Sequence, residues 1–215
     1  MSAPNGPSLR DISQIGHQMI ADIVQPNSRV LDVGCDDGDL MLLLEETKSV
    51  DARGMELLQS QVNKCVARGL AVVQGDADED LQHYPDGAFD YAIMSQVVQA
   101  TRDPAQVLDD LLRVANRAIL SFPNFAHWRN RVQIALHGNM PVTDKLPYSW
   151  HDTPNIHFCS IVDFLGLCRK LGATTEHLIV LDGKGQEVRP SASIRWKNLV
   201  GEQALIVLRR GGANG

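Results

Sequence analysis

The sequence predicts one α/β domain built on a doubly wound, mostly parallel sheet of seven strands. Three observations support this prediction. Short apolar runs alternate with helical segments as far as Phe122, the pattern of repeated strand–helix–strand units. Two further apolar runs near the C-terminus follow the last strongly helical segment and are predicted to close the sheet. At 215 residues and 44% hydrophobic content, the chain can bury one substantial core without a second domain.

The first third of the chain is predicted to form a βαβαβ unit behind an N-terminal helix. Apolar residues at helical spacing predict that helix over residues 9–24, and Pro26 ends it. Strands are predicted at residues 29–33, 50–55 and 70–74, with helices at 39–47 and 57–68. Single helices between consecutive strands imply parallel pairing, because a parallel crossover needs a connection of this length.

The rest of the chain continues the same pattern. We expect strands at residues 89–95, 117–122, 174–181 and 203–209, and helices at 104–114 and 160–171. Asp103 is the expected N-cap of the first of these helices, with Pro104 at its first position. Residues 9–210 are therefore predicted to form the domain. Residues 1–8 and 211–215, rich in small residues, are expected to be disordered tails.

Composition excludes several function classes. The 20 Lys and Arg residues are scattered against 26 Asp and Glu residues, so no basic patch for nucleic acid is expected. No C-x-x-C pair and no metal-ligand spacing of His or Cys occurs, so no metal site is predicted. No long apolar run predicts a membrane span or a secretion signal. We therefore expect a cytoplasmic protein with reduced cysteines.

Candidate cofactor-binding residues follow the first three strands, because open parallel sheets bind ligands at the carboxyl ends of their strands. The stretch VLDVGCDDGDL places Asp32 on the first strand and Gly34 and Gly38 in the turn after it. Glu56, after the second strand, is expected to accept both hydroxyls of a ribose. Asp76, after the third, is expected to accept a hydrogen bond from an adenine amine. The predicted site also includes Cys35 and Asp36 of the turn.

Structural roles are an alternative for the same residues. A turn of the form D-x-G-x-x-x-G fits many strand–helix junctions, and Glu56 also suits the N-terminus of a helix. Asp76 could equally belong to a polar turn and cap. Taken together, the residues favour S-adenosylmethionine over NAD. The turn lacks the G-x-G-x-x-G spacing of dinucleotide folds, and two closing strands suit a methyltransferase sheet.

Four motifs carry a family resemblance. Three of them are general: RVLDVGCDDGDL, FDYAIMSQVVQATRDP and VLDDLLRV. The fourth is far more specific: SFPNFAHWRNRVQIALHGNMPVTDKLPYSWHDTPNIHFCSIVDF. From about Leu9 to about Asp182 the chain resembles the methionine-biosynthesis family MetW. This resemblance implies the Rossmann-like, class I S-adenosylmethionine-dependent methyltransferase fold, and a role beside homoserine O-acyltransferase.

Two residues depart from the pattern of that family. MetW-like chains usually have glycine where this chain has Asp36, and a side chain there adds bulk and charge where backbone and cofactor meet. We therefore expect weakened, but not abolished, binding of S-adenosylmethionine. His151 stands where the family usually has tyrosine; a lone loop histidine is more often a surface residue than a base, and no catalytic residue is assigned.

Residues 123–159 form an unusually long connection, rich in Pro, Asn, His and aromatic residues. Its aromatic side chains suit a lid over the strand ends, a structural cover or an interface with a partner. Two functions remain open. One is a partner and activator of homoserine O-acyltransferase that senses S-adenosylmethionine, and the other is a methyltransferase acting on a small molecule. The altered turn and the absence of an evident base favour the first.

Overall fold

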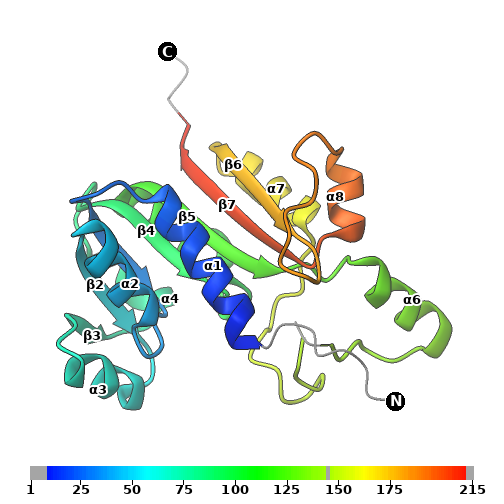
Figure 1. Ribbon diagram of the computed structural model, residues 1–215, viewed down its shortest axis with the longest axis horizontal. Helices are drawn as coiled ribbons and strands as arrows, with labels where there is room; N and C mark the ends of the chain where they lie inside the picture. Colours follow the sequence, from blue (N-terminus) through cyan, green and yellow to red (C-terminus); the bar gives the residue numbers. More distant parts are fainter. Residues whose placement is uncertain (1–8, 144–145, 212–215) are drawn as a thin grey trace.

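A seven-stranded sheet in the order β3-β2-β1-β4-β5-β7-β6 forms the centre of the protein (Figure 1). The computed structural model describes residues 9–143 and 146–211, with side chains from residue 14 onwards; the predicted tail at 1–8 and residues 212–215 lie outside the described residues. Neighbouring strands are parallel from β3 to β5, and β7 is antiparallel to both β5 and β6. The prediction of a mostly parallel, seven-stranded α/β sheet is confirmed.

All seven strands were predicted within two residues of their observed ends. The strands are β1 Arg29–Val33, β2 Asp51–Glu56, β3 Val72–Gln74, β4 Phe89–Ser95, β5 Ala115–Pro123, β6 Ala173–Leu181 and β7 Gln203–Arg210. The helices are α1 Leu9–Ile23, α2 Asp39–Lys48, α3 Gln59–Ala67, α4 Ala77–Asp80, α5 Pro104–Val114, α6 Trp128–His137, α7 Ile161–Lys170 and α8 Ile194–Val200. Two short 3₁₀ turns, Leu81–His83 and Val98–Ala100, follow α4 and β4. Helices α4, α6 and α8 were not predicted.

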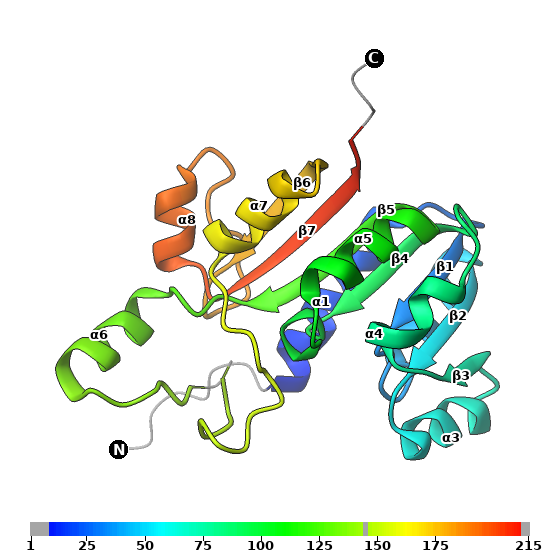
Figure 2. The ribbon, with the colours of Figure 1, turned by 180° about the vertical axis from the view of Figure 1, so that it is seen from behind.

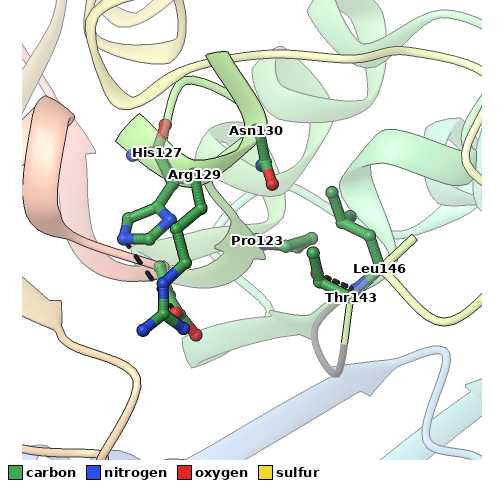
Figure 3. Close-up of a pocket in the computed structure, with 8 residues that line it drawn as sticks. Pro123, His127, Arg129, Asn130, Thr143 and Leu146 are labelled. Atoms are coloured by element: carbon green, nitrogen blue, oxygen red, sulfur yellow. Dashed lines mark hydrogen bonds and ion pairs between the residues drawn. The ribbon is translucent and has the colours of Figure 1, made fainter. Parts of the chain in front are cut away.

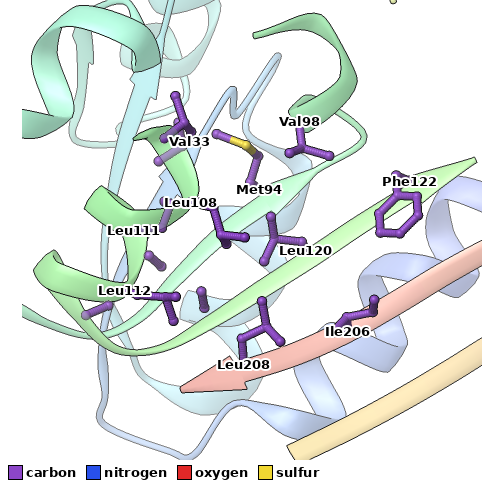
Figure 4. Packing of buried hydrophobic residues seen from close by; sticks show 14 of the residues in the cluster. Val33, Met94, Val98, Leu108, Leu111, Leu112, Leu120, Phe122, Ile206 and Leu208 are labelled. Carbon is purple, nitrogen blue, oxygen red and sulfur yellow. The ribbon is translucent and has the colours of Figure 1, made fainter. Parts of the chain in front are cut away.

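Helices cover both faces of the sheet (Figures 1 and 2). The strands bury apolar side chains on both faces, because successive strand residues point to opposite sides. Val30 of β1 packs with α1 and α2, whereas its neighbour Leu31 packs with α5 and α7. In β5, Ile119 and Leu120 divide between the two faces in the same way (Figure 4 shows the α5 face). Burying each such side chain stabilises the fold by roughly 1.5–3 kcal/mol.

Side-chain caps set the ends of several helices. Asp103 accepts hydrogen bonds from the backbone amides of Ala105 and Gln106, both at 3.1 Å, which confirms it as the N-cap of α5. Ser160 and Asp163 form a reciprocal capping box at the start of α7. By contrast, His127 at the start of α6 makes no side-chain cap bond. The missing cap signal is one reason why the sequence pattern did not predict α6.

Candidate functional site

The turn after β1 lies against the ends of β2 and β4. The backbone amide of Gly34 donates a 2.8 Å hydrogen bond to the carbonyl of Met55 on β2. Gly34 has a φ of +75°, and a Cβ atom there would lie 2.5 Å from a methyl group of Val97, just after β4. Gly38 has a φ of +83° at the N-cap of α2. Glycine is therefore required at both ends of the turn, by backbone conformation and by close approach.

Glu56 is hydrogen-bonded to the turn after β1, which lies 20 residues earlier in the sequence. One of its carboxylate oxygens, Oε2, accepts the backbone amide of Asp36 at 3.0 Å, and the other, Oε1, accepts that of Leu58 at 2.9 Å. Its side chain is buried. Each carboxylate oxygen has a further lone pair, so Glu56 is held rigidly and can still accept hydrogen bonds from a pair of hydroxyl groups.

Carboxylates make this end of the sheet strongly acidic. Burial, and secondly the charge of Glu56, raise the pKa of Asp32 to about 7. Burial also raises the pKa of Asp36, with smaller contributions from Asp37 and Glu56. Asp36 adopts a left-handed conformation with a φ of +49°, which Asp tolerates better than most residues. When ionised, these carboxylates attract a cationic ligand and repel a phosphate, and a nearby cation favours their ionised form.

Cys35 faces the sheet. Its Sγ atom lies 2.8 Å from where a Cβ on Gly54 of β2 would be, and its side chain is buried. The Sγ atom of Cys65 on α3 donates to the carbonyl oxygen of Asp36 at 3.1 Å. Burial raises the pKa of both thiols, so they stay protonated at neutral pH. The two cysteines therefore hold the turn against β2 and α3.

Asp76 lies at the N-cap of α4. Its Oδ1 atom accepts the backbone amide of Asp78 at 3.0 Å, and its Oδ2 atom accepts Nη2 of Arg102 at 2.8 Å. Arg102 also pairs with Asp78 and Glu79. The structure thus shows the turn-and-cap role that was the alternative for Asp76. Arg102 was not found from the sequence, because nothing in the pattern links it to a turn about 26 residues earlier in the chain.

Gln99 connects the loop after β4 to residues 123–159. Its Nε2 atom donates to the carbonyl of Pro123 at 3.1 Å and to Sγ of Cys159 at 3.2 Å. Its backbone carbonyl accepts the amides of Ile156 and His157, both at 2.9 Å. The buried Oε1 atom of Gln99 has no hydrogen-bond partner among the described residues. A water or another polar donor would satisfy this acceptor.

A second group of polar residues lines a pocket of about 50 Å³ at the carboxyl end of β5 (Figure 3). His127 is 6% exposed, and its Nε2 atom lies 3.9 Å from Oε1 of Glu202, at the start of β7. Burial lowers the pKa of His127, which Glu202 opposes and Arg129 reinforces. The lining residues are Pro123, Asn124, His127, Arg129, Asn130, Thr143, Leu146 and Glu202. A neutral imidazole in this position can accept a proton.

Neither His151 nor any group of metal-ligating side chains forms a further site among the described residues. The His151 side chain is 59% exposed, and its Nε2 atom lies 3.3 Å from Oδ2 of Asp152. Within residues 9–143 and 146–211, no cluster of three or more His, Cys, Asp or Glu side chains has the geometry to hold a metal ion. In the same part of the chain, no helix is long and apolar enough to cross a membrane.

Comparison with known sequences identifies the family. The sequence matches the family model described as methionine biosynthesis protein MetW over residues 14–208. This chain belongs to the MetW family. The bifunctional methionine biosynthesis protein MetXA/MetW of Rhodopirellula baltica is 30% identical over 206 residues, covering 91% of this chain. This MetW-family chain spans about a third (33%) of the length of that relative.

Solved structures related to the MetW chain share its fold at low identity. The S-adenosylmethionine-dependent methyltransferase from Mesorhizobium loti has a TM-score of 0.66 at 16% identity, over 93% of this chain and 100% of that one. The [4+2]-cyclase SpnF has a TM-score of 0.69, also at 16% identity, over 95% of this chain and 84% of that one. The fold is therefore that of class I methyltransferases. Because a cyclase also has this fold, the fold alone does not define the reaction.

Proposed function

We propose that this MetW-family chain is a partner and activator of homoserine O-acyltransferase that binds S-adenosylmethionine. The observation that carries the partner role is the Rhodopirellula relative, whose name joins MetXA and MetW in one polypeptide. Joining two modules in one chain raises their effective concentration for each other, which favours modules that act together.

The residues of the turn fit the chemistry of S-adenosylmethionine. This ligand carries a sulfonium, an ammonium, a carboxylate and a ribose, and it supplies an activated methyl group when bound. Glu56, oriented by the amides of Asp36 and Leu58, would accept the ribose hydroxyls. Asp32 in its ionised form would stabilise the positive charges. The same carboxylate would oppose the pyrophosphate of a dinucleotide.

A protein that both binds S-adenosylmethionine and activates the acyltransferase can act as a sensor of S-adenosylmethionine. S-adenosylmethionine is made from methionine, so its concentration reports on the supply of the pathway's product. A ligand can change the activity of a partner only if it binds the active and inactive states with different affinity. We propose that occupancy of the turn changes how strongly this protein activates the acyltransferase.

The test is an acyl-transfer assay with purified homoserine O-acyltransferase from the same organism. Acylation of homoserine is measured with the enzyme alone, with this protein added, and with both this protein and S-adenosylmethionine. The proposal expects this protein to raise the rate and the ligand to change that increase. An acylation rate that is the same in all three mixtures would overturn the proposal.

Methyl transfer to a small molecule is the second candidate, favoured by the pocket that contains His127 and Glu202. This pocket adjoins the end of β5, two strands from β1, or roughly 10 Å at the usual strand spacing. His127 is positioned to take a proton from an acceptor bound there, with Glu202 facing the imidazole. Transfer of radiolabelled methyl groups to a metabolite pool, lost in His127→Gln, would support this function over the first.

A further inference from the structure

Helix α6 projects beyond the carboxyl end of β5, and the described residues 138–143 and 146–158 follow it in the chain (Figures 1 and 2). We refer to residues 124–143 and 146–158 as the arm. Asn130 is the single buried residue of α6. A helix of a globular domain normally buries an apolar stripe against its own core. Because α6 does not, its apolar side chains have no covering surface among the described residues of this chain.

Three of the exposed apolar residues of α6 form a stripe, whereas Ile134, 47% exposed, lies on another side of the helix. Trp128, Val132 and Leu136 are spaced by four residues, which places them on one side of the helix. Their exposed fractions are 44%, 43% and 74%. Arg129 lies beside this stripe, with its guanidinium 5.5 Å from the centre of the Trp128 ring. Tryptophan and arginine are the residue types most enriched where interfaces gain their binding energy.

The returning part of the arm adds an aromatic hollow of about 20 Å³. Tyr148, Trp150 and Phe158 line it and are 51%, 74% and 47% exposed. The other lining residues are Phe125, Met140, Pro141, Leu146, Thr153 and Asn155. The rings of Phe125 and Phe158 pack together at 4.3 Å between centroids, which gives the hollow a firm wall. Such a hollow suits an apolar side chain of a partner.

The apolar area that the arm exposes is similar to the area that one partner buries in a specific interface. Together the stripe, the hollow and the neighbouring Val142 and Ile156 expose on the order of 800 Å² of apolar side chain, taking roughly 150–250 Å² for a whole aromatic side chain and less for an aliphatic one. A specific interface buries about 800 Å² on each partner.

We propose that the arm is the surface through which this protein docks on homoserine O-acyltransferase, an inference that rests on the proposed function. The relative whose name joins MetXA to MetW supports this choice of partner. A second copy of this chain is the less favourable occupant, because each copy has a net charge of −6 and the two would repel each other. The described residues of the arm hold Arg129, Arg131 and Asp152, so this surface carries no excess of negative charge, although the whole chain has a net charge of −6.

The test compares paired variants for binding to the purified acyltransferase by calorimetry. Leu136→Asp combined with Trp150→Ser changes the arm, and Val66→Asp combined with Val73→Ser is the matched control. Val66 and Val73 are 57% and 54% exposed, on α3 and β3 at the opposite end of the molecule (Figure 1). We expect the arm variant to lose about 100-fold in affinity and the control variant to bind within about twofold of the wild type.

Circular dichroism and thermal unfolding of each variant show that a loss of affinity is not a loss of fold. Slower hydrogen exchange of residues 128–137 on addition of the acyltransferase is expected as independent support. Equal affinity of the arm variant and the wild type would overturn the docking surface while leaving the partnership intact. No binding by the wild type would overturn the partnership itself. Dimers of this chain that the arm variant disrupts would overturn the choice of occupant.

Discussion

The backbone amide of Asp36 donates a 3.0 Å hydrogen bond to Oε2 of Glu56, across 20 residues of sequence. This bond joins the turn after β1 to the end of β2, the two places where the sequence predicted parts of one cofactor site. It also places Asp36, the residue that departs from the family pattern, directly beside the carboxylate proposed to hold a ribose. The bond involves the backbone of Asp36, so a substitution there keeps it available.

Replacing Asp36 with glycine is expected to strengthen binding of S-adenosylmethionine by about tenfold. Glycine removes both the bulk and the negative charge of the side chain from the turn where backbone and cofactor meet, whereas the relief of the positive φ of +49° stabilises the fold rather than the complex. Calorimetric titration measures the affinity. Asp36→Asn separates the two causes, because it removes the charge but keeps the side chain. Affinity that is unchanged or lower in Asp36→Gly would contradict the prediction.

Glu56→Gln is expected to weaken binding of S-adenosylmethionine by at least about tenfold and to reduce the free energy of unfolding by about 1–2 kcal/mol. The glutamine amide cannot accept hydrogen bonds from both Asp36 and Leu58, because one of its two polar groups is a donor. Calorimetry and urea denaturation measure the two effects. Glu46→Gln on the exposed side of α2 is the matched control and is expected to change neither.

Asp32 is expected to make the protein less stable as the pH rises from about 4 to about 7. The folded protein keeps a proton on Asp32 up to a pKa of about 7, whereas the unfolded chain loses it near 3.8. The folded state therefore binds more protons in this window, and the free energy of unfolding falls by at most about 4 kcal/mol. Above pH 7 this contribution is constant.

Asp32→Asn is the variant that isolates the contribution of Asp32. Asparagine has no proton to lose, so the difference in unfolding free energy between variant and wild type is expected to shift in favour of the variant between pH 4.5 and pH 7. Urea denaturation at several pH values measures this difference. Asp37→Asn, an exposed neighbour, serves as the control. A difference that does not vary with pH in Asp32→Asn would contradict the raised pKa.

His127 is expected to titrate below the ordinary value of 6.5, because burial disfavours its charged form. Glu202 favours the imidazolium form, so Glu202→Gln is expected to lower the pKa of His127 further. Titration of the imidazole resonances by NMR measures both values. A higher pKa in Glu202→Gln would show that the two side chains do not interact as the structure indicates.

The sequence patterns were sufficient for the fold, because strand and helix periodicity are local properties of the chain. Apolar runs such as the one at β4 and a cap such as Asp103 each depend on a few neighbouring residues. Helix α6 was missed for the complementary reason. No side chain caps its start. The run of apolar residues spaced by four was too short to predict a helix. Only Gly138, at a φ of +69°, marked its end.

For the proposed cofactor site, too, the sequence predicted some features and the tertiary structure decided others. By itself, the sequence predicted the seven strands and placed Glu56 and the glycine turn at the carboxyl ends of two consecutive strands, because strands joined by a single crossover helix usually lie close together. Only the tertiary structure decided which side chains meet. It directed Asp76 to Arg102, turned Cys35 toward β2 and brought His127 to Glu202. Those contacts depend on packing between segments far apart in the chain, for which no local pattern exists.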